Sequence, residues 1–154
     1  MIEYEIAKES DIKELYDLQL RAFESEAEMI GSRSVPALME TFEHSWVDFG
    51  NWTVLVTRND SGKIIGAVRY QNADDIVVIG RLMVAQEYRG QGVAINLMHA
   101  IEEVTKGRFF ELYTCTKIYI NINLYEKLGY RAYKEEPGED GLSFLYMRKI
   151  VDPR

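Results

Sequence analysis

The alternation of hydrophobic and polar residues divides the chain into strands and helices. Residues 2–6 alternate between apolar and acidic side chains, which predicts a strand with one covered face. From a cap at Ser10 or Asp11, apolar residues recur at steps of three and four through Ala22, so we expect a helix there. The polar stretch 24–35 includes a glycine and three serines, and it predicts a loop or a broken helix.

The middle of the chain predicts a second helix and then three strands. The helix covers 36–49 and begins with a proline, a residue that suits the first turn of a helix. The segments 52–57 and 63–70 are strand-like, and the turn-forming residues 59–62 join them as a hairpin. The third strand, 76–84, is nearly continuously apolar and is therefore expected to be buried.

The last third of the chain continues this alternation. A helix over 92–105 is followed by an apolar strand over 109–114, and a further helix stops at Gly129. The segments 130–133 and 142–150 predict a closing hairpin. The order β-α-α-β-β-β-α-β-α-β-β predicts an α/β architecture, in which helices pack on one mixed sheet.

Length and composition agree with a single domain over residues 1–154. The chain is 47% hydrophobic and 28% charged, which is ordinary for a globular protein and excludes a disordered one. The net charge is −7, and an acidic protein repels the phosphates of nucleic acids and of anionic lipids. We therefore expect neither nucleic acid nor a membrane as the main partner.

Few residues offer metal or redox chemistry, and nothing indicates export. The single cysteine, Cys115, excludes an intrachain disulfide and a zinc site made of cysteine pairs, so no metal is expected. The N-terminus lacks the basic and apolar regions of a signal peptide. The longest aliphatic run, 76–79, is far too short to span a membrane, so we expect a cytoplasmic protein.

The most informative segment is the glycine-bearing turn between the strand over 76–84 and the helix over 92–105. Small residues before a helix let backbone N–H groups converge on an anion, and Arg89 adds a positive charge. A Walker loop would need Lys and Ser or Thr after Gly92, and a Rossmann fingerprint would need a third glycine at Ile95. Taken alone, the turn also fits a tight connection that binds nothing.

Two blocks together resemble the GCN5-related N-acetyltransferase (GNAT) family. The first is Arg89-x-x-Gly92-x-Ala94, which is similar to the acetyl-CoA signature of that family. The second is the segment 121–130, Asn-Ile-Asn-Leu-Tyr-Glu-Lys-Leu-Gly-Tyr, which follows one strand and one helix later. The resemblance implies a mixed, mostly antiparallel sheet of about seven strands, with about four helices packed on it and splayed central strands.

The resemblance also implies acetyl-CoA as co-substrate and assigns site residues. The turn would hold the pyrophosphate, and the pantetheine arm would lie along the main chain of residues 82–84 as a pseudo-strand. The main-chain N–H groups near Met83 would polarise the thioester carbonyl. The implied cofactor-binding residues are Leu82, Met83, Val84, Arg89, Gly90, Gln91, Gly92, Val93, Ala94 and Asn121.

Tyr125 matches the helix tyrosine that often acts as general acid in this family. Its reference pKa is about 10, against ~8.5 for a thiol, so donation to the departing thiolate is feasible when the hydroxyl is close. The alternative is a tyrosine that only packs its ring. Asn121 is similarly open between a cofactor contact and a cap for the preceding loop.

The general base is not assigned by the sequence. Arg81 occupies the position where many relatives carry a glutamate, and arginine cannot accept a proton near neutral pH. Arg81 could hold a carboxylate of the substrate or pair with Glu111. The acidic or basic candidates elsewhere are Glu24, Glu26, His44, Asp74, Asp75 and Glu111, or a water chain could serve.

The leading prediction is therefore an acetyl-CoA-dependent N-acetyltransferase that acts on the primary amine of a small molecule. One alternative is a protein or peptide N-acetyltransferase, which would need an open groove for an extended chain. Another is a non-catalytic acyl-CoA-binding module. Glu24, Glu26 and Glu28 near the expected acceptor side are compatible with a cationic amine. The oligomeric state is left open, and a homodimer is compatible with the sequence.

Overall fold

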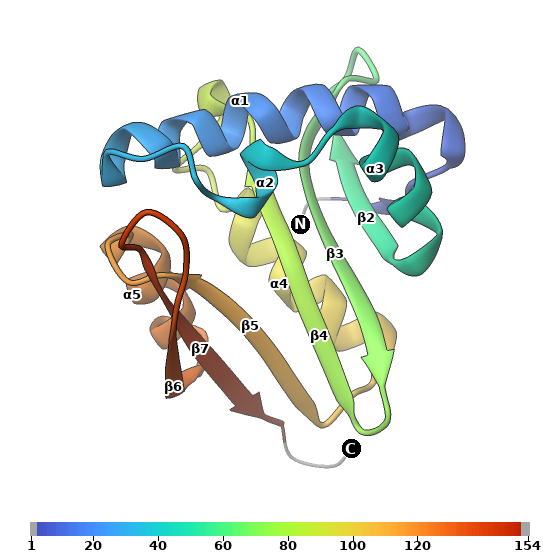
Figure 1. Cartoon of the computed structure of the whole chain (residues 1–154). Coiled ribbons are helices and arrows are strands. Elements are labelled where there is room, and N and C mark those ends of the chain that lie inside the picture. The colour runs from blue at the N-terminus through green and yellow to red at the C-terminus, as the bar shows by residue number, and fades with distance from the viewer. Residues whose placement is uncertain (1–2, 152–154) are drawn as a thin grey trace.

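In a computed structural model, the described residues 3–151 form one mixed sheet of seven strands (Figure 1). The order across the sheet is β1-β2-β3-β4-β5-β7-β6, and every neighbouring pair is antiparallel except β4 and β5. This confirms the predicted mixed, mostly antiparallel sheet. The strands are β1 (Glu5–Ile6), β2 (Thr53–Arg58), β3 (Ile64–Ala73), β4 (Ile76–Val84), β5 (Phe109–Cys115), β6 (Arg131–Pro137) and β7 (Ser143–Ile150).

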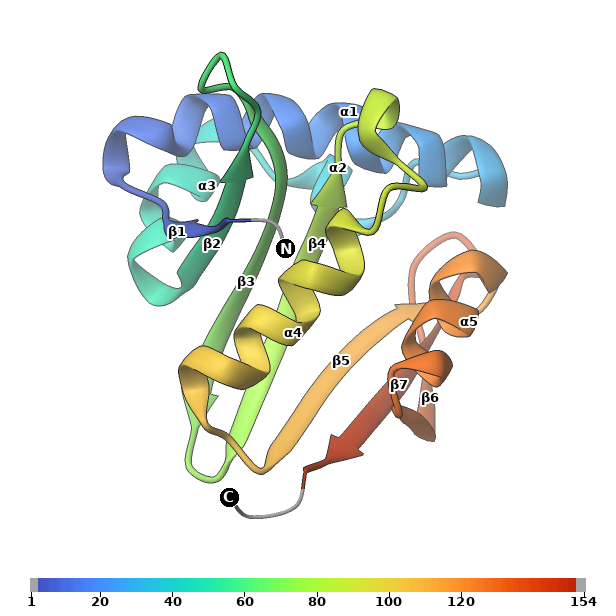
Figure 2. The ribbon, with the colours of Figure 1, turned by 180° about the vertical axis from the view of Figure 1, so that it is seen from behind.

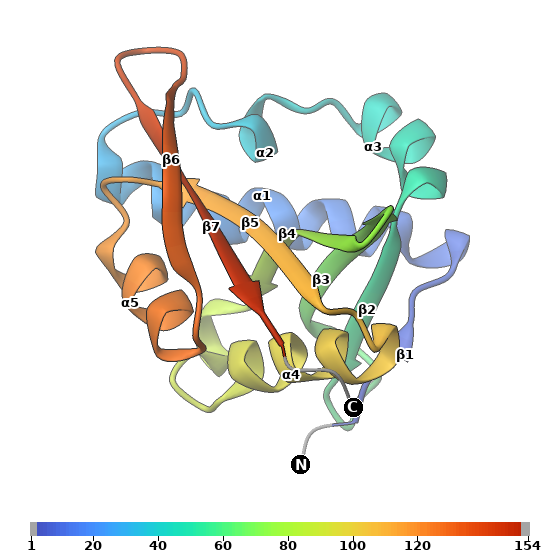
Figure 3. The same cartoon turned by 90° about the horizontal axis from the view of Figure 1, so that it is seen from below.

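Helices cover both faces of the sheet, as Figures 2 and 3 show. Helices α1, α2 and α3 lie on one face, and α4 and α5 lie on the other. None of the helices within residues 3–151 is both long enough and apolar enough to cross a membrane. The helices are α1 (Ile12–Ile30), α2 (Pro36–Met39), α3 (Phe42–Asp48), α4 (Val93–Thr105) and α5 (Tyr119–Lys127).

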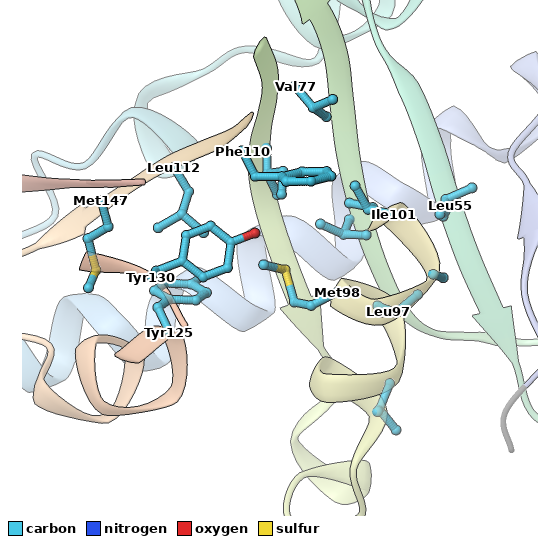
Figure 4. Packing of buried hydrophobic residues seen from close by; sticks show 14 residues of the cluster. Leu55, Val77, Leu97, Met98, Ile101, Phe110, Leu112, Tyr125, Tyr130 and Met147 are labelled. Atoms are coloured by element: carbon cyan, nitrogen blue, oxygen red, sulfur yellow. The ribbon is translucent and has the colours of Figure 1, made fainter. Parts of the chain in front are cut away.

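The strand period of two builds a separate core on each face. Along β2, Leu55 packs into the cluster under α4 and α5, whereas its neighbours Val54 and Val56 pack under α1. The cluster under α4 and α5 joins Leu97 and Ile101 of α4 to Leu112 of β5, Met147 of β7 and Tyr130, as Figure 4 shows. Burial of both faces explains why β4 is nearly continuously apolar.

The sheet opens between β4 and β5. These two strands pair only at Ile76↔Phe109, Val77↔Phe110 and Val78↔Glu111, and beyond that point they diverge (Figure 1). The splay expected from the family resemblance is therefore present. A β-bulge adds to it, because the register with β3 jumps from Arg69↔Gly80 to Ala67↔Met83.

Two expectations about the first helices were wrong. The stretch 24–35 is neither a loop nor a broken helix as far as Ile30, because α1 continues to that residue; only the link from Gly31, which has a left-handed φ of 74°, to Val35 is a loop. Its apolar side continues as far as Ala27 and Ile30, both buried, while Glu28 is exposed and Glu26 lines a cavity at the splay. The single helix expected over 36–49 is instead α2 and α3, separated by an extended residue at Glu40.

The first and last predicted strands also differ in extent. Residue 2 of the strand expected over 2–6 lies outside the described residues, and β1 covers only Glu5–Ile6. The closing hairpin is present but longer than expected on its first side, because β6 continues to Pro137. The predicted bounds 76–84 agree with those of β4.

Candidate functional site

The turn from β4 to α4 forms a hollow that is rich in free backbone donors. Gly90 and Gly92 both adopt left-handed conformations, with φ of 77° and 83°, which glycine reaches without strain. Within residues 3–151 the backbone N–H groups of 90–95 have no backbone acceptor. A cavity of about 220 Å³ lies against this turn and extends to Leu124 of α5. Free backbone donors at a helix N-terminus are suited to binding an anion.

The first turn of α4 is held close to the sheet at Gly66 of β3. A Cβ added to Gly66 would lie 2.6 Å from Cγ1 of Val93 and 3.2 Å from Cδ1 of Leu97. A side chain at this position would therefore have to displace Val93 at the start of the helix. The close contact fixes the hollow at the turn relative to the unpaired side of β4.

A second cavity, of about 160 Å³, lies in the opening between β4 and β5; we call it the central cavity. The link from α1 to α2 covers it on one side, where Val35 and Ala37 are buried. That link meets the β6–β7 turn, because Oγ of Ser32 donates a hydrogen bond of 2.6 Å to Oδ2 of Asp140. The central cavity is thus covered on this side.

Tyr125 lies at the α5 side of the central cavity. The residue is 7% exposed, and its ring packs edge-on against Tyr130 with 6.1 Å between ring centroids (Figure 4). Burial, together with the nearby charge of Glu26, raises the pKa of the Tyr125 phenol. The hydroxyl therefore keeps its proton throughout the neutral range and can serve only as a donor there.

Glu26 lies beside Tyr125 because α1 is longer than expected. It follows Phe23 by three residues on the same side of the helix, and both line the central cavity. Burial raises the pKa of Glu26, and the opposing hydrogen bond from Asn121 and charge of Arg89 do not cancel this effect. Nδ2 of Asn121 lies 3.4 Å from Oε2 of Glu26 and 3.3 Å from Oγ1 of Thr114.

Arg81 lines the central cavity on its β4 side, at the bulge. It has a φ of +50°, and its Nη1 donates to Oε1 of Glu40 at 3.2 Å. The pairing with Glu111 considered from the sequence was wrong, because Glu111 accepts from Nη2 of Arg148 on the neighbouring strand β7. Glu40 is 4% exposed and also accepts from Gln19.

The pKa of Glu40 shows that this carboxylate is kept charged. Burial pushes its pKa upward, but the hydrogen bonds from Gln19 and His44 and the charge of Arg81 together hold it below the usual range. Glu40 is therefore a permanent counter-ion for Arg81 rather than a proton acceptor at neutral pH. His44 is exposed and bonded to Glu40, outside the lining of the central cavity.

The other candidates for a general base lie away from the central cavity. Asp74 and Asp75 occupy the β3–β4 hairpin at the closed end of the splay. Glu24 pairs with Arg33 at the surface. Among the titratable candidates raised by the sequence, Glu26 is the one that lines the central cavity in the described part of the chain.

The predicted cofactor residues divide between the two cavities. Leu82 lines the central cavity and Val84 lines the hollow at the turn, so residues 82–84 connect the two along the unpaired side of β4. Met83 is buried under α1, and only its main chain can take part. Asn121 lies at the central cavity and not at the turn. The residues lining the hollow at the turn include Arg89, Gly90, Gly92, Val93 and Ala94.

Gln91 lies at the turn without lining the hollow there, and three residues that were not predicted lie at or behind the central cavity. Gln91 belongs to the turn, but its exposed side chain points back to the carbonyl oxygen of Glu87. Sequence reasoning missed Trp52 and Arg69 at the central cavity and Glu40 behind it. The sequence pattern around these residues did not indicate a site, because each comes from a different element and only the tertiary fold brings them together. Within residues 3–151 no group of three His, Cys, Asp or Glu side chains could hold a metal ion.

The chain is similar to known acetyltransferases in sequence and fold. Residues 24–151 match the family model described as an acetyltransferase (GNAT) domain. The ribosomal-protein-S18-alanine N-acetyltransferase of Escherichia coli has a TM-score of 0.79 at 19% identity, covering 100% of this chain and 96% of that one. A Streptococcus mutans protein has a TM-score of 0.80 at 18% identity, covering 98% and 100%. The ribosomal-protein-alanine N-acetyltransferase of Brucella melitensis has a TM-score of 0.74 at 19% identity, covering 97% and 100%.

Proposed function

Since this chain belongs to the GNAT acetyltransferase family, we propose that it transfers the acetyl group of acetyl-CoA directly to the primary amine of a small molecule. The observation that carries this proposal is the pair of connected cavities. One has the donors for a pyrophosphate, and the other has an acid and a base for amine chemistry. Residues 82–84 of β4 join them.

The donor side fits acetyl-CoA in shape and charge. The N–H groups of 90–95 and the positive end of α4 would bind the pyrophosphate, with Arg89 beside them. The main chain of 82–84 faces the splay without a strand partner, so it can bond the amide groups of a pantetheine arm. Bound there, acetyl-CoA supplies an activated acetyl thioester. We assign the N–H groups near Met83 to polarising its carbonyl.

The acceptor side favours a small molecule over an extended peptide. The central cavity holds about 160 Å³, close to the roughly 150 Å³ of a cavity that binds one benzene ring. The link between α1 and α2, joined to the β6–β7 turn through Ser32 and Asp140, covers one side of the central cavity. An open groove, which a peptide substrate would require, is therefore not favoured.

Glu26 and Tyr125 suit the two proton transfers of the reaction. Glu26 would first take one proton from the bound ammonium and pass it to water, and would then accept the second proton that nitrogen loses as the C–N bond forms. Its raised pKa brings it closer to neutrality, where a base is most effective. Tyr125 would donate a proton to the sulfur as the C–S bond breaks. The proton on Glu26 then leaves to water, and water restores the proton of Tyr125. Opposite roles for two neighbouring groups are typical of acid–base pairs.

The test is an acyl-transfer assay with a panel of small primary amines and short peptides. The purified protein is mixed with acetyl-CoA and each acceptor, and the release of free thiol is followed. We expect release above the acceptor-free rate with small amines, and little with peptides that carry the same amine at their N-terminus. Faster release with the peptides would instead favour a peptide acetyltransferase.

Binding of acetyl-CoA is measured separately by thermal unfolding. A ligand that binds only the folded state stabilises it by RT ln(1 + L/Kd), where L is the free ligand concentration, so the unfolding temperature rises with the logarithm of ligand concentration once the ligand is well above its Kd. Stabilisation by acetyl-CoA without thiol release from any acceptor would indicate a binding module without turnover. If acetyl-CoA neither stabilises the protein nor releases thiol with any acceptor, the proposal is contradicted.

A further inference from the structure

The charged groups that line the central cavity are separated by sign. Arg69 of β3 and Arg81 of β4 line it on one side of the splay. Glu26 lies on the other side, where it contacts Asn121 of α5. Since β3 and β4 precede the opening and β5 and α5 follow it, the positive and negative groups lie across the cavity from each other. Tyr125 is on the negative side.

Arg81 has donors to spare for a ligand. Within residues 3–151 its guanidinium makes one polar contact, from Nη1 to Oε1 of Glu40. A guanidinium carries five N–H donors in a planar fork that matches a carboxylate. The side chain is 14% exposed at the cavity wall, and Glu40 behind it fixes the orientation of the group. The unused donors are therefore available to a bound anion.

Arg69 lies next to Arg81 and is even less satisfied. Its Nη1 reaches Oδ2 of Asp48 at 3.3 Å, and Trp52 stacks on the guanidinium with 3.9 Å to the ring centroid. Its Nε is sealed from solvent and has no acceptor among the described residues. A buried donor without an acceptor is destabilising, and such a group in a native protein calls for an explanation.

Arg69 nevertheless lines the central cavity beside Gly80, which has no side chain to fill the space between them. The Nε of Arg69 lies 3.6 Å from the position that a Cβ of Gly80 would take, and Gly80 itself lines the central cavity. Burial lowers the pKa of Arg69 to about 10, and repulsion by the charge of Arg81 contributes to this shift. An anion placed between them would relieve this repulsion.

We propose that the acceptor is a small free amino acid, whose carboxylate binds Arg81 and Arg69 while its amine lies beside Glu26 and Tyr125. This inference rests on the proposed function and adds the chemical class of its substrate. Both charges of the zwitterion then meet an opposite charge in the cavity wall. A cavity of about 160 Å³ admits such a molecule, since roughly 150 Å³ suffices for benzene.

The first test compares each amino acid with its own amide. Alanine, methionine and phenylalanine are assayed beside alaninamide, methioninamide and phenylalaninamide, with thiol release as the readout. The amides keep the amine and side chain but lack the carboxylate. We expect kcat/KM for at least one free acid to exceed that of its amide on the order of ten- to a hundredfold, the effect of one charge-assisted hydrogen-bond pair. Equal rates, or faster acetylation of the amides, would overturn the inference while leaving the proposed function intact.

The second test removes the arginine without leaving a buried charge. The double variant Arg81→Gln with Glu40→Gln keeps the wall neutral, and Arg81→Lys keeps the charge but loses the fork. The expected result is a rise in KM for the free acids of about ten- to a hundredfold in the double variant and a smaller rise in the lysine variant, with a clearly smaller change in KM for the amides than for the acids. Equal losses for acids and amides would mean that Arg81 only supports the fold, and would overturn the assignment.

A matched control and a binding measurement complete the design. Arg58→Gln removes an arginine that is also held by ion pairs, to Glu5 and Asp11, but outside the central cavity, and it should leave the preference for acids unchanged. Calorimetry with CoA-saturated protein tests binding of the same amino acids without turnover. Binding that weakens in the double variant supports the inference, and no difference between acids and amides contradicts it. Failure of the proposed function appears differently, as no thiol release from any amine in the wild-type protein.

Discussion

Glu26 and Tyr125 show how neighbouring side chains can acquire opposite chemical roles. Burial raises the pKa of both, but the effect differs because one acid is charged at neutral pH and the other is not. The raised pKa makes Glu26 a stronger base than a solvated carboxylate. It also keeps Tyr125 protonated. Their closeness reinforces this division, since the charge of Glu26 opposes ionisation of the phenol.

Replacing Tyr125 by Phe should lower kcat on the order of a hundredfold, because only the proton donor is lost. The Kd for acetyl-CoA should remain within about twofold, since the ring still packs against Tyr130. Steady-state kinetics and calorimetry measure the two quantities. Tyr130→Phe is the matched control: its hydroxyl is buried without a partner in the described part of the chain, so its removal should spare activity. Equal activity of the two variants would remove Tyr125 from the mechanism.

Replacing Glu26 by Gln should abolish the acidic limb of the pH–rate profile. In the wild type, the rate is expected to fall as the pH drops through the raised pKa of Glu26, because the protonated carboxyl cannot accept a proton. The variant should show a low rate without that limb. Glu24→Gln on the same helix, at the surface beside Arg33, serves as control. An unchanged profile in Glu26→Gln would exclude Glu26 as the base.

The same variant should be more stable than the wild type at pH 7. A carboxyl whose pKa is raised on folding destabilises the folded state above that pKa, because ionisation is harder there than in the unfolded chain. Glutamine removes this cost. The gain in unfolding temperature should shrink toward pH 4, where the carboxyl is protonated in both states. A loss of stability at pH 7 would show that the charge is instead favourable.

At the scale of elements, the length of α1 and the bulge in β4 determine the site. The period of apolar residues correctly predicted β4 and α4, since their burial depends on local alternation and on one helix face. It failed at the end of α1 because the polar residues around Ala27, at 24–26 and 28, interrupt the apolar pattern that continues to the buried Ile30. The spacing of Phe23, Ala27 and Ile30 before Gly31 was the signal that could have corrected it.

The contacts of Arg81 could not be read from local sequence. Glu40 is 41 positions away, and it reaches Arg81 only because α2 and α3 are separated at that residue. The bulge that exposes Arg81 likewise depends on pairing with β3. Tyr125 was found from its motif, but its neighbour Glu26 remained one of several candidates until the fold of α1 was known. Contacts between distant segments limit what periodicity predicts.

The close contact between α4 and β3 gives a test at this scale. Gly66→Ala adds a Cβ 2.6 Å from Cγ1 of Val93, so it should lower the free energy of unfolding by about 1–3 kcal/mol and weaken binding of acetyl-CoA. Gly50→Ala is the control, because a Cβ there meets nothing within 4 Å. Urea unfolding and calorimetry measure both effects. Equal midpoints for the two variants would show that α4 can shift without cost.

At the scale of the whole molecule, the net charge of −7 conceals a division of carboxylates by pKa. Burial opposes ionisation of Asp11, Glu40 and Asp48, but in each case hydrogen bonds and neighbouring positive charges prevail, so their pKa values lie below the usual range. The unfolded chain therefore binds protons more readily than the folded one at these positions. Such groups stabilise the folded state above about pH 4.5.

The protein should accordingly lose stability as the pH falls below about 4.5. The contribution of these carboxylates is complete above their unfolded pKa values, near 3.8 for Asp and 4.5 for Glu, and it disappears as the pH falls through the lower folded values. Glu26 acts in the opposite direction, because its pKa is raised. Urea unfolding between pH 3 and 7 should give a free energy that rises from pH 3 to about pH 5 and gains nothing further from these carboxylates above it. A maximum at pH 4 or below would contradict this account.

The splay between β4 and β5 has a consequence for how the chain avoids unwanted association. A sheet normally has two edge strands, but within residues 3–151 this one also presents unpaired main chain along the divergent parts of β4 and β5. Edge strands can recruit other chains, and proteins protect them. Here the inner pair is recessed beneath the link from α1 to α2 and beside α5, where a foreign strand cannot easily enter. Partial unfolding of that link would expose aggregation-prone backbone from the middle of the sheet.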